Sequence, residues 1–257
     1  MPPTPSLAGW TVVSLRPQNR HDALRRAAAA QGARMFAASP FRLRATGDRA
    51  ALDAALACPI RIVSSPEAVR FAAALRPLRG SWWAVGQGTA RALRAAGATR
   101  VEIAEPQNAN GLLALPSLRD LRGQAVGLVT APDGRGLMER ELPARGARLH
   151  VAHVYVREPI PLVPARLQAL AALGPRAALL VSSQSAFGQF WRQLDEKTRA
   201  VWRGRPCIAS SARLLQYLRQ QGFRQLAQAE STHPPAMLAA LAALAACAGT
   251  DRTRSRP

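Results

Sequence analysis

LHVAHVYVREP, residues 149–159, is the stretch on which the organisation of this chain depends. Its valines predict a β-strand, and Glu158-Pro159 predicts where that strand ends. The segments before and after it carry similar strand–helix patterns, so it lies near the seam between two related halves. Tyr155, one of two tyrosines in the chain, falls at this seam. Its side chain serves either packing or chemistry.

The length and composition are typical of a globular protein of one large domain or two modest ones. Hydrophobic residues make up 48% of the 257 residues. The longest apolar run, Met237–Ala248, is too short to span a bilayer, so no membrane partner is expected. Three scattered cysteines favour a reducing, cytoplasmic location. Four histidines form no ligand pattern beyond a weak His150/His153 pair, and we expect no metal or other cofactor.

The net charge of +20, from 35 basic and 15 acidic residues, is the strongest compositional signal. A basic balance favours polyanionic partners such as nucleic acid, acidic membranes, or a polycarboxylate or phosphate ligand. However, Lys197 is the only lysine and alanine is abundant, so codon bias explains the arginines at least as well. The arginines are also spread through the chain, and aromatics at 5% disfavour a single-strand nucleic-acid surface.

Strands and helices alternate along the chain with short links, which predicts an α/β fold with parallel sheets. Strands are expected at 11–15, 34–38, 60–63, 82–85, 101–103, 125–130, 177–181 and 207–209. Helices are expected at 21–31, 66–75, 90–96, 111–115, 137–142, 166–173, 187–194, 212–221 and 235–247.

An internal repeat indicates two similar domains. Ile62-Val-Ser-Ser-Pro-Glu-Ala-Val69 and Leu180-Val-Ser-Ser-Gln-Ser-Ala-Phe187 align without a gap, each at the end of a strand and the start of a helix. Ligands of such folds bind at the carboxyl ends of the strands. Ser65 and Ser183 have the acceptor oxygen that an N-cap needs, and we favour that role. Exposed helix N-termini and hydroxyls also bind anions, and the two roles are compatible.

Several short motifs, in order and spacing, resemble those of the uroporphyrinogen-III synthase family from Trp10 to Leu244. They are Leu15-Arg16-Pro17, Val63-Ser-Ser-Pro-Glu-Ala-Val69, Ala84-Val-Gly-Gln-Gly-Thr-Ala90, Gly134-Arg135 with Leu142 and Arg145-Gly-Ala147, Val154-Tyr155, and Val181-Ser-Ser-Gln-Ser185. Each motif is short, but the shared order along the chain is much less easily produced by chance.

The resemblance implies an α/β fold of two similar parallel-sheet, flavodoxin-like domains joined by a two-stranded connector. The chain would begin and end in the same domain, which makes that domain discontinuous. The expected bounds are 1–38 with 160–250 for the first domain, 43–152 for the second, 39–42 and 153–159 for the connectors, and 251–257 for a disordered tail.

The family cyclises hydroxymethylbilane to uroporphyrinogen III, with loss of water and inversion of ring D, in tetrapyrrole (haem) biosynthesis. The resemblance implies this cofactor-independent hydro-lyase activity on a polycarboxylate tetrapyrrole, in a cytoplasmic protein. We expect a monomer with no nucleic-acid partner. The alternative is a non-catalytic two-lobed protein that binds an anionic ligand or nucleic acid, which the charge favours. A family member that has lost activity is a third possibility.

The resemblance also assigns the site residues. The family's tyrosine falls on Tyr155, and a phenol is protonated at neutral pH, so it can donate to the departing hydroxyl. The implied substrate-binding residues are Arg16, Ser64, Ser65, Gly86, Gln87, Thr89, Gly134, Arg135, Ser182, Ser183 and Ser211. The second half departs from the family pattern, because Ser211 and Leu214 replace a glycine and a threonine, and Gln184 replaces the commoner proline.

Overall fold

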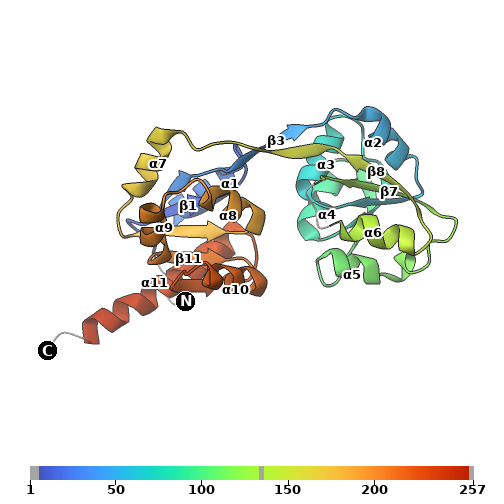
Figure 1. Ribbon diagram of the computed structural model, residues 1–257. Coiled ribbons are helices and arrows are strands. Elements are labelled where there is room, and N and C mark those ends of the chain that lie inside the picture. Colours follow the sequence, from blue (N-terminus) through green and yellow to red (C-terminus); the bar gives the residue numbers. More distant parts are fainter. Residues whose placement is uncertain (1–5, 133–135, 255–257) are drawn as a thin grey trace. The chain divides into compact units, whose positions relative to one another are not determined.

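The computed structural model describes residues 6–132 and 136–254. Its contacts divide the chain into two compact units: unit 1 comprises Met1–Arg42 and Glu158–Pro257, and unit 2 comprises Leu43–Arg157. Each unit contains a five-stranded parallel sheet with helices packed against it (Figure 1). The chain is therefore an α/β protein with two parallel-sheet halves, as its alternating strands and helices predict.

Unit 1 is organised around central strands that are buried along their whole length. Its elements are β1 (Thr11–Ser14), α1 (Asp22–Ala30), β2 (Arg34–Ala37), α7 (Pro164–Ala171), β10 (Ala177–Val181), α8 (Gln184–Trp191), α9 (Glu196–Arg203), β11 (Pro206–Ala209), α10 (Ala212–Gln220), β12 (Gln225–Gln228) and α11 (Pro234–Arg254). β1 and β10 have no exposed residue, as expected for parallel strands covered on both faces. Leu24 of α1 and Leu238 of α11 share one core with Val12 and Leu180.

Unit 2 has two cores, one on each face of its sheet. Its elements are α2 (Arg49–Leu56), β4 (Ile60–Val63), α3 (Pro66–Ala73), β5 (Gly80–Ala84), α4 (Gln87–Ala95), β6 (Ala98–Ile103), α5 (Ala109–Ala114), the 3-10 turn η1 (Pro116–Leu118), β7 (Ala125–Thr130), α6 (Leu137–Ala144) and β8 (Arg148–His153). Val129 of β7 packs with Leu52 and Leu93, whereas Leu128 packs with Leu142. Helices α2, α3 and α4 therefore cover one face, and α5 and α6 cover the other.

The two sheets have the same spatial arrangement of strands, but the chain begins with a different strand of that arrangement in each unit. The order is β12-β11-β10-β1-β2 in unit 1 and β6-β5-β4-β7-β8 in unit 2. The repeated Val-Ser-Ser motif follows β10 and β4, so these strands correspond, and their neighbours then match one to one. Counted along its own strands, unit 1 has the flavodoxin order 2-1-3-4-5 and unit 2 has 3-2-1-4-5. The halves are thus related by circular permutation.

A two-stranded sheet connects the units. It pairs β3 (Phe41–Ala45) antiparallel with β9 (Tyr155–Pro159), and both unit boundaries fall inside these strands. Arg42 donates two hydrogen bonds of 3.0 Å each to the Glu158 carboxylate. This ion pair is exposed, so it contributes little to stability. Pro159 is accommodated because every strand of a two-stranded sheet has a free edge.

The stretch 149–159 forms two strands, which corrects the prediction of a single strand. β8 and β9 are separated by Val154 alone. The Val154 N–H donates to the Thr130 carbonyl at 3.0 Å, whereas the Val154 carbonyl accepts from the Thr46 N–H at 3.2 Å. The backbone therefore leaves the sheet of unit 2 and enters the two-stranded sheet at one residue. Hydrophobic periodicity does not register such a change of pairing partner.

The C-terminal segment also differs from its prediction. A disordered tail was expected from residue 251, but α11 continues to Arg254. The alanine-rich segment that precedes it has high helix propensity, and helix extension costs little once a nucleus exists. Residues 255–257 lie outside the described residues.

The N-cap prediction is confirmed in both halves. Ser65 Oγ accepts a hydrogen bond from the Ala68 N–H at 3.1 Å, and Ser183 Oγ accepts one from the Ala186 N–H at 3.3 Å. Both serines have the extended backbone that an N-cap requires. The repeated motif therefore starts α3 and α8 in equivalent places.

Candidate active site

Tyr155 borders a pocket in unit 2. The pocket has a volume of about 230 Å³ and is called the Tyr155 pocket below. It is lined by Ser64, Ser65, Ala109, Thr130, Ala131, Gly136, Leu137, Met138, Glu139, Tyr155 and Arg157. The tyrosine is only 3% exposed, and its ring stacks on Phe71 with centroids 5.1 Å apart. This packing fixes the orientation of the ring and therefore the position of the phenol oxygen at its polar end.

Hydroxyl groups from two neighbouring strands meet in this pocket. Ser64 follows β4 and Thr130 ends β7, and their hydroxyl oxygens are 2.8 Å apart. Ser65 Oγ lies 3.5 Å from the Tyr155 phenol oxygen, which is the outer limit of a hydrogen bond. β4 and β7 flank the point where the chain changes direction across the sheet. Such switch points are where parallel α/β sheets bind ligands.

Charged groups complete the pocket. Arg157 of β9 lies with its guanidinium carbon 5.9 Å from the centre of the Tyr155 ring. Glu139 of α6 lines the same pocket. The described lining residues therefore offer a phenol, three aliphatic hydroxyls, one cation and one carboxylate to a ligand. This set can bind an anionic group and can move a proton.

Sequence reasoning predicted three of these residues and missed three others. Ser64, Ser65 and Tyr155 were predicted, and the structure brings them together. Thr130, Glu139 and Arg157 were not. The signal for Thr130 is topological, since it ends a strand that the repeat places next to β4.

The predicted residues Gly86, Gln87 and Thr89 do not reach the Tyr155 pocket. They lie at the start of α4, where the Gln87 N–H donates to the Gln107 side-chain oxygen at 2.9 Å. A β-carbon on Gly86 would meet that same oxygen, so the close approach at this glycine is made by Gln107. Thr89 is 4% exposed. Binding of substrate by these three residues stays a prediction.

The switch point of unit 1 is closed. Arg16 and Ser182 lie there between β1 and β10, but the cavity is only about 10 Å³, and Leu24 and Met237 are among its lining residues. That volume holds at most about one water molecule. Arg16 donates to the Thr232 carbonyl at 2.7 Å, and burial lowers the pKa of its guanidinium.

The remaining predicted residues act as caps or lie outside the described part of the chain. Ser183 caps α8, and its hydroxyl also lies 3.0 Å from that of Ser185. Ser211 caps α10 by accepting from the Leu214 N–H at 3.4 Å. Gly134 and Arg135 fall outside the described residues.

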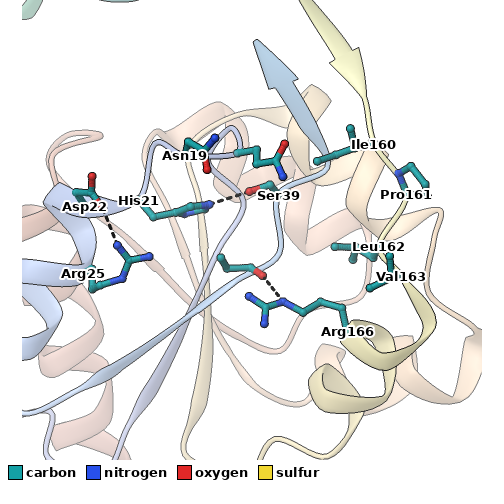
Figure 2. A pocket seen from close by; sticks show the side chains of 12 residues that line it. Asn19, His21, Asp22, Arg25, Ser39, Ile160, Pro161, Leu162, Val163 and Arg166 are labelled. Carbon is teal, nitrogen blue, oxygen red and sulfur yellow. Dashed lines mark hydrogen bonds and ion pairs between the residues drawn. The ribbon is translucent and has the colours of Figure 1, made fainter. Parts of the chain in front are cut away.

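Unit 1 has its own pocket, which sequence reasoning missed. It has a volume of about 510 Å³ and is called the His21 pocket below (Figure 2). It is lined by Gln18, Asn19, His21, Asp22, Arg25, Ala37, Ser39, Ile160, Pro161, Leu162, Val163 and Arg166. The buried His21 ring joins two serines, with Nδ1 3.0 Å from Ser14 Oγ and Nε2 2.7 Å from Ser39 Oγ. No metal-ligand spacing marks this histidine in the sequence.

His21 makes the stability of the protein pH-dependent. Burial lowers the pKa of its imidazole, and Arg25, Arg16 and Arg166 lower it further, against an opposite effect of Asp22. The unfolded chain therefore binds a proton at a higher pH than the folded chain does. We expect the free energy of unfolding to fall as the pH drops below about 6.5.

The test is chemical denaturation of His21→Asn between about pH 8 and pH 5. We expect this variant to lose less stability on acidification than the wild type. The exposed His233 supplies the matched control, and His233→Asn should keep the wild-type slope. Equal slopes in all three proteins would show that His21 does not set the pH dependence.

Among the described residues, no group of three or more histidine, cysteine, aspartate or glutamate side chains could hold a metal ion. None of the described helices combines the length and the hydrophobicity that crossing a bilayer requires.

Two permuted parallel-sheet units and a hydroxyl-lined pocket at a switch point define a two-domain α/β protein with a candidate small-molecule site. A family comparison then identifies the group of proteins concerned. The model of the family "Uroporphyrinogen-III synthase HemD" matches residues 22–239, most of the chain, and the chain belongs to this family. Members are hydro-lyases that cyclise hydroxymethylbilane to uroporphyrinogen III in haem biosynthesis.

Solved structures share the fold. A mutant uroporphyrinogen III synthase from the extremely thermophilic bacterium Thermus thermophilus is 18% identical, with a TM-score of 0.62 over 93% of this chain and 99% of that chain. Uroporphyrinogen-III synthetase from Helicobacter pylori is 14% identical, with a TM-score of 0.60 over 93% of this chain and 99% of that chain. The two-domain α/β fold expected from the resemblance is thus confirmed.

Proposed function

We propose that this chain forms uroporphyrinogen III with Tyr155 as the acid that assists departure of the substrate hydroxyl. The supporting observation is the position of the Tyr155 phenol, held by Phe71 beside the hydroxyls of Ser64, Ser65 and Thr130. A general acid must lie within hydrogen-bond reach of the atom it protonates, and this pocket gives the departing hydroxyl such a place.

The proposed step balances in protons. The Tyr155 O–H bond breaks as its proton passes to the substrate hydroxyl, the carbon–oxygen bond of that hydroxyl breaks, and water leaves. Inversion of ring D requires that the carbon which lost the hydroxyl bond to the α-carbon of ring D that already carries a methylene bridge. The bond to that bridge then breaks and re-forms at the free α-carbon, which loses one proton when the pyrrole's aromaticity is restored. That proton returns the phenolate to the phenol. The phenolate lives only between these two transfers, and Arg157 lies close enough to stabilise its negative charge.

The aliphatic hydroxyl groups of the Tyr155 pocket have a different role from the phenol, which is to hold the reacting end of the substrate. The bilane also cyclises without the enzyme and gives the wrong isomer, so control of conformation matters as much as proton transfer. Ser64, Ser65 and Thr130 offer oriented hydrogen bonds, and the start of α3 adds backbone N–H groups. Fixed geometry of this kind lowers the entropic part of a barrier.

A coupled assay tests the proposed function. Purified protein is supplied with hydroxymethylbilane, and the type I and type III isomers are separated after oxidation. We expect type III to dominate. A product mixture in which type I dominates would reject the enzymatic function and favour a non-catalytic member of the family.

We further propose that the protein is a cytoplasmic monomer. Cys58 and Cys207 are buried thiols without a disulfide in the described residues, and burial raises the pKa of both. Such thiols suit a reducing compartment. Each unit also has its own closed core, so folding does not require a second copy. Sedimentation analysis measures the oligomeric state directly.

A further inference from the structure

The His21 pocket in unit 1 has no role in the proposed chemistry, yet its polar groups form an ordered set. Three separate segments build it: the loop after β1 with the start of α1, the end of β2 with Ser39, and residues 160–166 with the start of α7. Figure 2 shows His21, Ser39, Arg25 and Arg166 around the same space. The pocket is more than twice the volume of the Tyr155 pocket.

The lining carries an excess of positive charge. Arg25 comes from α1 and Arg166 from α7, and Asp22 is the only carboxylate among the described lining residues. Asp22 pairs with Arg25 at 2.6 Å, so the charge of Arg166 is not balanced by a carboxylate among those residues. Since His21 is held neutral by burial and by the nearby arginines, the lining has a net charge of about +1. An anion is therefore favoured there over a cation.

Arg166 is held in place by a backbone carbonyl and an aromatic ring. Its Nε donates to the Ala37 carbonyl at 3.0 Å, and its guanidinium carbon lies 4.3 Å from the centre of the Phe36 ring. Figure 2 shows the side chain extending away from α7 to this hydrogen bond. A guanidinium fixed through Nε keeps the donors at its other end for a ligand, and two such donors match the two oxygens of a carboxylate.

The histidine orients a hydroxyl in the pocket. Ser14 Oγ accepts from the Arg16 backbone N–H at 3.4 Å, and His21 Nδ1 lies 3.0 Å from the same oxygen. In the tautomer in which Ser14 donates to Nδ1, Nε2 carries the imidazole proton and donates it to Ser39 Oγ at 2.7 Å. A serine that accepts from the imidazole turns its own O–H elsewhere. Because Ser39 lines the pocket, that O–H is a donor for a ligand.

We propose that the His21 pocket binds a carboxylate, with Arg166 and Arg25 as its charged donors and Ser39 as its hydroxyl donor. The assignment of that carboxylate to a side chain of the tetrapyrrole substrate rests on the proposed function, because the substrate bears eight carboxylates. His21 is a positioning residue, since it acts on the ligand through Ser39. The anion site itself follows from the geometry of unit 1 alone.

Titration calorimetry with uroporphyrin III, a stable octacarboxylate, tests the site directly. We expect the double variant Arg25→Gln/Arg166→Gln to bind it at least about tenfold more weakly, as loss of charge-assisted hydrogen bonds predicts. Ser39→Ala should weaken binding severalfold. The exposed Arg224 lines neither pocket, and Arg224→Gln should change the Kd less than about twofold. Because Arg25 and Arg166 are exposed, the difference should shrink in high salt.

The kinetic readout separates this inference from the proposed function. In the coupled assay the double variant should raise the KM for hydroxymethylbilane about as much as it raises the Kd, with kcat within about twofold of wild type. If wild type gives type III but the double variant matches Arg224→Gln in Kd, the pocket is not a carboxylate site. If wild type gives only type I but the double variant still binds more weakly, the anion site stands and the proposed function falls. Absence of uroporphyrin binding by wild type would also overturn the site.

Discussion

The Tyr155→Phe variant should form uroporphyrinogen III about a hundredfold more slowly than wild type, the lower end of the range for general acid catalysis. The substitution removes only the hydroxyl, so the 5.1 Å stacking on Phe71 and the burial of the ring persist. Within the described residues, the hydroxyl loses one hydrogen-bond partner, Ser65, at 3.5 Å. We therefore expect the free energy of unfolding to change by less than about 1 kcal/mol.

The other tyrosine of the chain supplies the matched control. Tyr217 lies on α10 in unit 1, where its ring makes an edge contact with Phe187 at 5.9 Å. Tyr217→Phe should keep the wild-type rate and isomer ratio. If Tyr155→Phe also turns over at the wild-type rate, the phenol is not the acid. A slower rate with an unchanged share of type III would assign Tyr155 to proton transfer alone, whereas a rising share of type I would show that it also controls the substrate conformation.

Local signals in the sequence were sufficient for most of the fold. Ser65 and Ser183 start helices because each combines a strand end with an acceptor oxygen, and the structure has both caps. Strands such as Ala125–Thr130 were found at their full length, since buried parallel strands are continuous apolar runs. The helix Arg49–Leu56 was missed, although Asp48 caps it through the Ala51 N–H. Its eight residues contain only two large apolar side chains, Leu52 and Leu56, and the apolar periodicity is correspondingly weak.

The site was less predictable than the fold, because a pocket stays open only where no side chain from another part of the chain occupies the space. The repeat made the switch points of the two units look equivalent. In unit 2 that point is open beside Tyr155, but in unit 1 only a cavity of about 10 Å³ is left, with Leu24 and Met237 in its lining. These two residues come from α1 and α11, which are distant in sequence from Ser182. No local sequence pattern shows that the side chains of Leu24 and Met237 lie at this switch point. Arg16 and Ser182 were therefore predicted to line an open pocket, which unit 1 does not have there.

A single added methyl group at Gly127 should unfold unit 2 or come close to doing so. Gly127 is buried in the middle of β7, between β4 and β8, on the face that α2 covers. A β-carbon there would overlap the backbone carbonyl of Ala55 in α2. Backbone cannot rotate away as a side chain can, so the helix must move off the sheet. We expect Gly127→Ala to lower the free energy of unfolding by at least about 3 kcal/mol.

Gly188 is the control for this prediction, because the same change should have the opposite sign there. It lies inside α8, where an added β-carbon would meet only the end of the Arg192 side chain at 3.9 Å. Gly188→Ala should stabilise the protein by about 0.5–1 kcal/mol through helix propensity. Denaturant unfolding of both variants, followed by tryptophan fluorescence, measures the difference. A Gly127→Ala protein as stable as wild type would mean that α2 does not rest on β7 as closely as the structure has it. In that case the contact between α2 and β7 could not be what holds Thr130, at the end of β7, beside Ser64.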